Sequence, residues 1–184
     1  IGVDMQKTIT VAVDAMGGDN APKEIVKGAV LAVNDKNNIK VILVGKEDVI
    51  RNELELYDYH KDRISIVAAE DNITNNEAPV MAIRRKKNSS IVVALNLVKK
   101  GEADAFVSAG STGAVLAGGQ LIIGRIKGVQ RPPLAPIIPT INGASLLIDC
   151  GANVDARPAH LLQFAKMGSL YVENLLGIDN PRVA

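Results

Sequence analysis

Short apolar runs alternate along the chain with stretches in which apolar residues recur every three or four positions. The apolar runs predict strands that are covered on both faces, over residues 8–14, 40–45, 63–68, 104–108 and 144–149. The longer periodic stretches predict helices over residues 22–34, 46–59, 80–87, 90–100, 112–124 and 158–176. Alternation of this kind predicts an α/β fold with a largely parallel sheet.

Two predicted helices carry further expectations. The segment 112–124 is apolar almost all round, so we expect it in the core or in a subunit interface. The helix that begins at Pro158 has an apolar stripe, which we expect to face inward, and Gly177 is its expected end. The stripe consists of Leu161, Leu162, Ala165, Val172 and Leu176.

The composition narrows the class of protein. The 184 residues are 47% hydrophobic but only 3% aromatic, and the net charge is +1, which argues against nucleic-acid binding. One cysteine excludes an intramolecular disulfide and fits a reducing cytoplasm. The first 14 residues lack the pattern of a signal peptide, and no apolar run reaches the ~20 residues of a membrane span. We interpret residues 1–4 as a vector remnant and residues 5–184 as a single α/β domain.

The stretch 104–119 predicts a short buried strand, a tight polar glycine loop and then a helix. Backbone N–H groups at a helix start, together with the positive end of the helix dipole, favour a phosphate or another oxyanion. We therefore predict that the loop binds phosphate. The alternative is a structural turn with Thr112 as helix N-cap. The candidate residues of this loop are Ser108, Gly110, Ser111, Thr112 and Gly113.

Two further polar loops, 14–20 and 149–157, also follow predicted strands. Ligands of parallel sheets bind beyond the carboxyl ends of the strands, so we expect all three loops to face one place. The first loop would form an adjacent wall of the phosphate site, although Asp19 or Asn20 could instead cap the next helix. Its candidate residues are Asp14, Gly17, Gly18 and Asp19.

The third loop carries the densest polar cluster, in which Asn153 is a further candidate phosphate ligand. Arg157 could bind phosphate through two parallel hydrogen bonds, and His160 could act as acid or base near neutral pH. With Asp155 they form the candidate catalytic group. The alternative is that Asp155 caps the helix and His160 lies on its exposed first turn. We expect Cys150, at a buried strand end, to be a small core residue.

Five separated segments occur in a fixed order. Together they resemble the fatty acid/phospholipid synthesis protein PlsX family, the acyl-ACP:phosphate acyltransferases, and the resemblance runs from about Thr8 to the last residue. The sequence departs from the usual family pattern at Ser111, Cys150 and Ala159, where Asn, Val and Glu are common. The five segments are residues 13–22, 84–90, 108–114, 124–128 and 147–160.

The resemblance implies a reaction of acyl-ACP (ACP, acyl carrier protein) with inorganic phosphate that gives acyl phosphate and free ACP for phospholipid synthesis. It implies a Rossmann-like three-layer α/β/α homodimer, related to phosphotransacetylases and to isocitrate and isopropylmalate dehydrogenases. It implies no metal and no organic cofactor. It also implies a bacterial cytoplasmic enzyme, of which this chain is an N-terminal portion, with peripheral membrane association through a later part.

The basic run Arg84, Arg85, Lys86 and Lys87 has two interpretations. A cationic helix end in solvent is common, because the helix dipole favours positive charge there. The run could instead dock ACP, which is acidic, through opposite charge.

Other functions remain open alternatives. One is a phosphotransacetylase that acts on short acyl-CoA, and another is a fragment that binds phosphate or ACP, or dimerises, without turnover. A nicotinamide-dependent dehydrogenase is disfavoured, because no Gly-x-Gly-x-x-Gly follows the first predicted strand.

Overall fold

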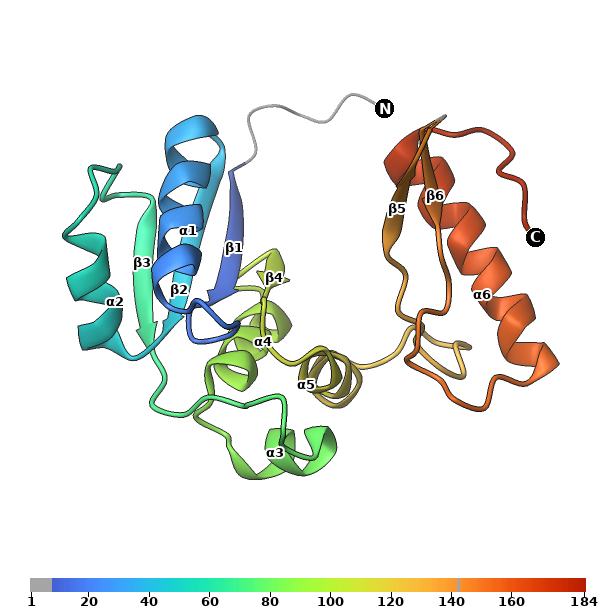
Figure 1. The fold of residues 1–184 in the computed structure, drawn as a ribbon, viewed down its shortest axis with the longest axis horizontal. Helices are drawn as coiled ribbons and strands as arrows, with labels where there is room; N and C mark the ends of the chain where they lie inside the picture. The colour runs from blue at the N-terminus through green and yellow to red at the C-terminus, as the bar shows by residue number, and fades with distance from the viewer. Residues whose placement is uncertain (1–7, 142) are drawn as a thin grey trace. The chain divides into compact units, whose positions relative to one another are not determined.

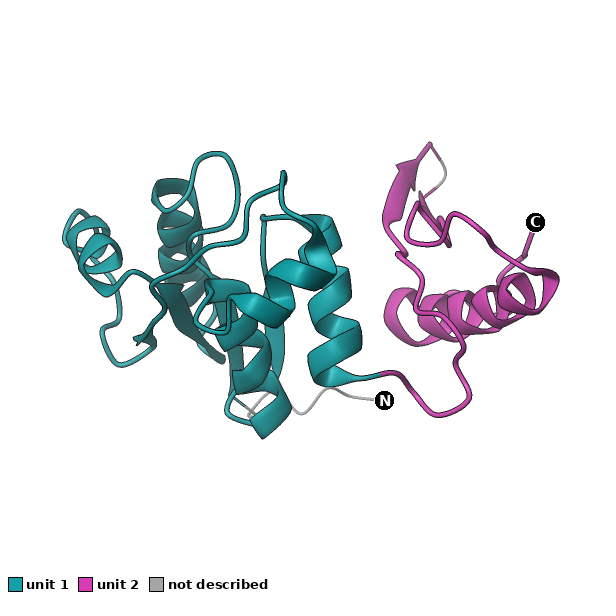
Figure 2. Cartoon of the chain, turned by 90° about the horizontal axis from the view of Figure 1, so that it is seen from below, with its two compact units in different colours: residues 1–124 teal, residues 125–184 magenta. Residues whose placement is uncertain are grey.

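The computed structural model describes residues 8–141 and 143–184, so the proposed vector remnant lies outside the described residues. The chain divides into two compact units, residues 1–124 and 125–184, drawn in different colours in Figure 2. Each unit is described by itself. That residues 5–184 form one domain stays a prediction.

The first unit is built on a four-stranded sheet. Its strands are β1 (Ile9–Asp14), β2 (Ile39–Gly45), β3 (Ile64–Ala68) and β4 (Ala105–Val107). Their order across the sheet is β3-β2-β1-β4, and every neighbouring pair is parallel. Four of the predicted strands therefore form the predicted parallel sheet, but the predicted burial of β4 is wrong, because it is an edge strand and Val107 is 54% exposed.

Helices cover both faces of this sheet (Figure 1). On one face, α1 (Lys23–Asp35) and α2 (Glu47–Leu54) pack on the strands in a single apolar cluster. On the other face, α4 (Ser90–Lys100) places Ala94 and Leu97 against strand residues that include Ala12. The unit therefore has the three-layer α/β/α arrangement.

A group of shorter helices joins α4. Here α3 (Pro79–Arg85), α5 (Thr112–Gly118) and the π-helix η1 (Gly119–Ile123) form an apolar cluster with α4. The prediction of a buried helix over 112–124 holds only for its first part. Ala114, Ala117 and Gly118 are buried, whereas Leu121 and Ile123 are each 45% exposed.

The second unit contains a two-stranded hairpin and a helix. Strands β5 (Ile137–Thr140) and β6 (Gly143–Leu146) pair antiparallel. The predicted strand over 144–149 is confirmed as far as Leu146, but its predicted burial is wrong, because β6 pairs with its neighbour in the chain as a hairpin and is partly exposed. Helix α6 (Pro158–Tyr171) continues as the π-helix η2 (Val172–Leu176).

The inward face of α6 differs from the predicted stripe. Leu161 and Leu162 are 55% and 59% exposed, so for them the prediction was wrong, whereas Phe164 and Gly168 are buried. Gly177 adopts φ +64° and ends the helical segment, as predicted. In the described parts of the chain, the helices are too short or too polar to cross a bilayer.

Candidate functional site

The site begins where the strand order of the first unit reverses. From β1 the chain proceeds to β2 and β3 on one side, and it then returns to place β4 on the other side of β1. Crevices at such switch points, beyond the carboxyl ends of the strands, are where open α/β sheets bind ligands. Val13 pairs with Val107, so the next residues, Asp14 and Ser108, lie side by side at this edge.

A short chain of hydrogen bonds joins these two strand ends. The Asp14 side chain is only 1% exposed. Its Oδ2 accepts a hydrogen bond from Ser108 Oγ at 2.7 Å, and its Oδ1 accepts the Met16 N–H at 3.1 Å. Ser108 Oγ in turn accepts the Gly110 N–H at 3.0 Å. The predicted loops 14–20 and 108–114 are therefore in direct contact.

Glycines make this contact possible. A Cβ on Gly17 would lie 2.3 Å from Asp14 Oδ2 and 2.9 Å from the Gly110 nitrogen. A Cβ on Gly110 would lie 3.2 Å from Gly17 Cα. Gly18 has φ +103° and packs against Ala109, a conformation that favours glycine. The sequence analysis predicted these glycines as part of a phosphate site, and the structure shows that Gly17 and Gly110 lie against each other's loop.

The glycine loop leads into α5 through Ser111. Ser111 is the N-cap residue, and its buried Oγ accepts the Ala114 N–H at 3.3 Å. The helix cap of the alternative interpretation is therefore Ser111 and not Thr112, which is exposed. Gly113 lies against Pro79, since a Cβ there would be 2.7 Å from Pro79 Cγ. The Ala114 amide is thus satisfied by the cap, whereas the Thr112 and Gly113 amides precede the first intrahelical hydrogen bond, which leaves them for another acceptor.

The other polar residues of the first loop lie at the surface. Asp19 and Asn20 are exposed. The N-cap position of α1 is Pro22, so neither residue takes the capping role of the alternative interpretation. Asn20 contributes its carbonyl oxygen, which accepts the Glu24 N–H at 3.1 Å.

The third predicted loop, 149–157, belongs to the second unit. That it faces the same place as loops 14–20 and 108–114 stays a prediction. Here Asp149 is the organising residue, which the sequence analysis did not single out. Its Oδ1 accepts the Leu134 N–H at 2.6 Å, and its Oδ2 accepts Asn153 N–H at 2.7 Å and Asn153 Nδ2 at 3.0 Å. Burial by itself would raise the pKa of Asp149, but these hydrogen bonds and one from Ala152 outweigh it and lower the pKa.

The candidate catalytic group of this loop is only partly brought together. His160 is 5% exposed, and its Nδ1 accepts the Arg157 N–H at 3.2 Å, so the neutral ring carries its proton on Nε2. The N-cap residue of α6 is Arg157 rather than Asp155, and His160 is buried rather than exposed, so both parts of the alternative interpretation are wrong. Asp155 and the Arg157 side chain are exposed. Asn153 Nδ2 also donates to the Pro132 carbonyl at 3.1 Å.

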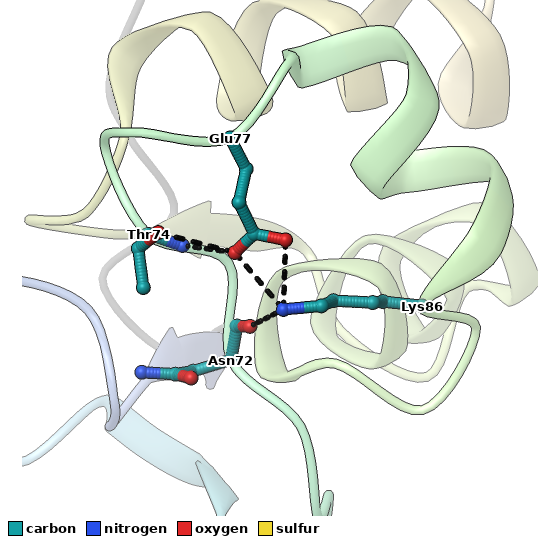
Figure 3. Close-up of polar contacts among 4 residues, drawn as sticks. All are labelled: Asn72, Thr74, Glu77 and Lys86. Atoms are coloured by element: carbon teal, nitrogen blue, oxygen red, sulfur yellow. Dashed lines mark hydrogen bonds and ion pairs between the residues drawn. The ribbon is translucent and has the colours of Figure 1, made fainter.

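The basic run contains one half-buried side chain, Lys86, which forms an ion pair, and three exposed side chains, of which Lys87 donates to the Ile83 carbonyl at 3.4 Å. Lys86 Nζ lies 2.8 Å from Glu77 Oε2 and donates to the Asn72 carbonyl at 2.8 Å (Figure 3). Glu77 also accepts the Thr74 N–H at 2.8 Å, and the Lys86 hydrogen bond, followed by that of Thr74, lowers the pKa of Glu77. Lys86 therefore fixes the loop before α3. The exposed members of the run are Arg84, Arg85 and Lys87.

A groove of about 710 Å³ lies within the second unit, between β6, α6 and the segment 178–184. Its lining is mostly apolar and includes Leu146, Phe164 and Val183. In the part of the chain that the structure describes, the residues that line this groove include none of the predicted site residues. Cys150 is half-buried and unpaired by disulfide. Residues 8–141 and 143–184 contain no group of three or more His, Cys, Asp or Glu arranged to hold a metal.

The fold and the two locked loops define an α/β protein with a candidate site at the switch point of its parallel sheet. Residues 9–184 match the family described as "Fatty acid synthesis protein", and the chain belongs to this family. It is 56% identical over 173 residues to the phosphate acyltransferase of Clostridium novyi and 50% identical to that of Caldanaerobacter subterraneus. These alignments cover 94% of this chain but 52% and 51% of the relatives, so the chain spans about half their length.

Solved structures show the same fold. A phosphotransacetylase from Streptococcus pyogenes superposes with a TM-score of 0.69 at 19% identity, over 94% of this chain and 55% of that chain. The EutD phosphotransacetylase from Staphylococcus aureus gives 0.66 at 20% identity, with the same coverage of both chains. The predicted relation to the phosphotransacetylase fold is confirmed.

Proposed function

We propose that this chain is part of a phosphate acyltransferase that converts acyl-ACP and inorganic phosphate into acyl phosphate and free ACP. A phosphate oxygen forms a bond to the thioester carbonyl carbon, the carbon–sulfur bond breaks, and the leaving thiolate of ACP takes up a proton. Phosphate is already a nucleophile, so the protein has to position it and to stabilise the oxyanion that develops.

The observation that carries this proposal is the locked pair of glycine loops at the switch point. The Ser108–Asp14 hydrogen bond and the Gly17–Gly110 approach hold the start of α5 at the carboxyl edge of the sheet. Amides at a helix start are donors for phosphate and for a developing oxyanion. Family membership supports the same chemistry, since the curated relatives are phosphate acyltransferases.

The residues divide by role in this proposal. Thr112 and Gly113, in the first turn of α5, are the phosphate and oxyanion donors, with the Ser111 hydroxyl beside them. Gly17, Gly18 and Asp19 form the neighbouring wall. From the second unit we propose Asn153, Asp155, Arg157 and His160, with Arg157 as phosphate ligand because its guanidinium is exposed.

The direct test measures thiol release from a long-chain acyl-ACP by this chain, with and without inorganic phosphate. Phosphate-dependent release with acyl phosphate as co-product is expected. Thr112→Val should weaken saturation by phosphate more than saturation by the acyl donor, and Thr140→Val, at an exposed position of β5, is the control. Release that does not depend on phosphate would contradict the proposal.

The same assay separates the alternatives. Faster release from short acyl-CoA than from acyl-ACP would favour a phosphotransacetylase activity. Binding of phosphate or ACP without release would favour a non-catalytic fragment. The structural neighbours share the fold, at 19% and 20% identity, and do not decide between these activities.

We also propose that Arg84, Arg85 and Lys87 dock the acidic ACP, while Lys86 keeps its structural contacts with Glu77. Arg84 and Arg85 end α3, and Lys87 follows its C-cap residue; the first residue of α3, Pro79, lies against Gly113 of the glycine loop. Opposite charge would steer ACP toward this edge of the first unit.

A pair of double variants tests the docking surface. Arg84→Gln with Arg85→Gln should slow reaction with ACP-linked donors at low salt, and should leave CoA-linked donors unchanged. Lys99→Gln with Lys100→Gln removes the same charge from the last turn of α4 and is the control. Equal effects of the two double variants would contradict docking at α3.

The remaining expectations concern the whole protein. We propose a homodimer, a bacterial cytoplasmic location with peripheral membrane association, and a reaction without metal or organic cofactor. The support is the family membership and, for the cytoplasm, the single cysteine in 184 residues.

A further inference from the structure

The buried carboxylate of Asp14 has an unusual place beside an anion-binding loop. Burying a charge is costly unless hydrogen bonds compensate it. The hydrogen bonds that the structure gives Asp14 come from two uncharged donors, the Met16 amide and the Ser108 hydroxyl. A carboxylate would also repel a phosphate dianion at close range. Direct binding of phosphate by Asp14 therefore conflicts with its charge, and another role has to account for its position.

The direction of the hydrogen bonds shows what Asp14 does. Its carboxylate can only accept, so Ser108 donates its hydroxyl proton to it at 2.7 Å. The Ser108 oxygen then accepts the Gly110 N–H at 3.0 Å. The hydroxyl proton of Ser108 and the amide proton of Gly110 are thus both committed within the protein. They hold the loop rather than contact a ligand.

We propose that Asp14 is a positioning residue, which fixes the Ser108 hydroxyl and, through it, the Gly110 amide, so that the first turn of α5 presents its donors to phosphate. This inference rests on the proposed function. It reassigns Asp14, Ser108 and Gly110 from phosphate ligands to the support of the loop. The ligands are then the groups that follow, at Ser111, Thr112 and Gly113.

The close contact between Gly17 and Gly110 makes the hydrogen-bonded pair of loops rigid. Gly17 follows Asp14 by three residues and lies against Gly110, with no room for a Cβ between Asp14 Oδ2 and the Gly110 nitrogen. Loss of the Asp14–Ser108 hydrogen bond would let the carboxylate and Ser108 turn away from each other. The loop would then sample several conformations, and binding energy would be spent on ordering it.

The test measures binding of inorganic phosphate to this chain by calorimetry, with phosphate and acyl-donor KM values where turnover is observed. Asp14→Asn and Ser108→Ala should each weaken phosphate binding about tenfold, as expected for loss of a hydrogen bond to a charged group. The double variant should bind phosphate as tightly as the single variant with the lower affinity, because both changes break the same hydrogen bond. Ser108→Thr, which keeps the hydroxyl, should bind close to wild type.

Asp104→Asn is the matched control. Asp104 Oδ2 accepts the Thr10 N–H at 2.8 Å, so it joins the same two strands at their amino ends. Its replacement should leave phosphate affinity unchanged. Hydrogen exchange at the Gly110 amide adds a second readout, which should speed up in Asp14→Asn and Ser108→Ala but not in Asp104→Asn.

Each outcome decides between the two proposals. No phosphate binding by the wild-type chain would overturn the phosphate site and, with it, this inference. Normal wild-type binding with unchanged affinity in the Asp14 and Ser108 variants would overturn the inference alone. So would effects that multiply in the double variant, or tighter binding by Asp14→Asn, which would show that the Asp14 charge acts directly on the anion. If Asp14→Asn does not fold, the Ser108→Ala and Ser108→Thr pair decides.

Discussion

Replacement of Gly17 by alanine is the smallest change that should separate the two loops. The added Cβ would lie 2.3 Å from Asp14 Oδ2, 3.0 Å from Asp14 Cγ and 2.9 Å from the Gly110 nitrogen. Real Cβ atoms essentially never approach other atoms closer than 3.0 Å. Two of the three neighbours belong to a buried, hydrogen-bonded carboxylate and the third is backbone, so relief requires that the two loops move apart.

The magnitude follows from two terms. Overpacking of a close contact costs roughly 1–3 kcal/mol. Displacement of Asp14 would also weaken its hydrogen bond with Ser108, and hydrogen bonds to charged groups contribute roughly 1.5–3 kcal/mol. Alanine also restricts the unfolded chain more than glycine does, which stabilises the folded state by about 0.4–1 kcal/mol and offsets part of this loss. We expect Gly17→Ala to lower the free energy of unfolding of the first unit by roughly 2–5 kcal/mol.

Gly28→Ala is the control with the same chemical change. Gly28 lies inside α1, and a Cβ there would meet nothing within 4 Å. Alanine in a helix interior is favoured over glycine by roughly 0.5–1 kcal/mol, so this variant should be stabilised. Hydrogen exchange of the β1 and β2 amides reports unfolding of the first unit separately from the second. A Gly17→Ala variant within about 0.5 kcal/mol of wild type would refute the argument from close approach.

Three further predictions concern single side chains. Ser111→Ala should lower the free energy of thermal unfolding by about 1 kcal/mol, because it removes the N-cap hydrogen bond of α5. Ser89→Ala should leave that free energy nearly unchanged, because the buried Ser89 Oγ has no partner among the described residues. Equal losses of stability in the two variants would contradict this. Glu77→Gln should destabilise the protein at neutral pH, because a lowered pKa means that the ionised form of Glu77 stabilises the fold. The difference in stability between the variant and wild type should shrink as the pH falls below about 4.3. A difference that stays constant with pH would contradict this. Asp149→Asn should speed hydrogen exchange at the Leu134 amide, and unchanged exchange would show that the carboxylate does not hold that segment.

Much of the first unit could be predicted from the sequence, because the signals are local. Apolar runs predicted all four parallel strands, and periodic stretches predicted α1 and α4 nearly to their ends. The glycine loops could be predicted as a site for a related reason. In a parallel sheet the carboxyl ends of neighbouring strands meet, so the loops after β1 and β4 have to be close once the strand order is 3-2-1-4.

The second unit was predicted less well. The apolar run 144–149 gives the same local signal for a central parallel strand and for one arm of a hairpin. Its pairing with β5 depends on a neighbour in the fold rather than on its own sequence. The exposed Leu161 and Leu162 show the same limit, because periodicity marks an apolar face but does not say what covers it.

The sequence by itself determined the order of strands and helices along the chain, the edge of the sheet at which the loops after β1 and β4 meet, and the residue types available there. Only the tertiary structure decided which group each polar atom meets: Ser108 with Asp14, Gly110 with Gly17, and Lys86 with Glu77. The physical reason is range. Propensity and periodicity act over a few residues, whereas the Ser108–Asp14 hydrogen bond joins residues 94 positions apart, at a distance that only the packed sheet sets.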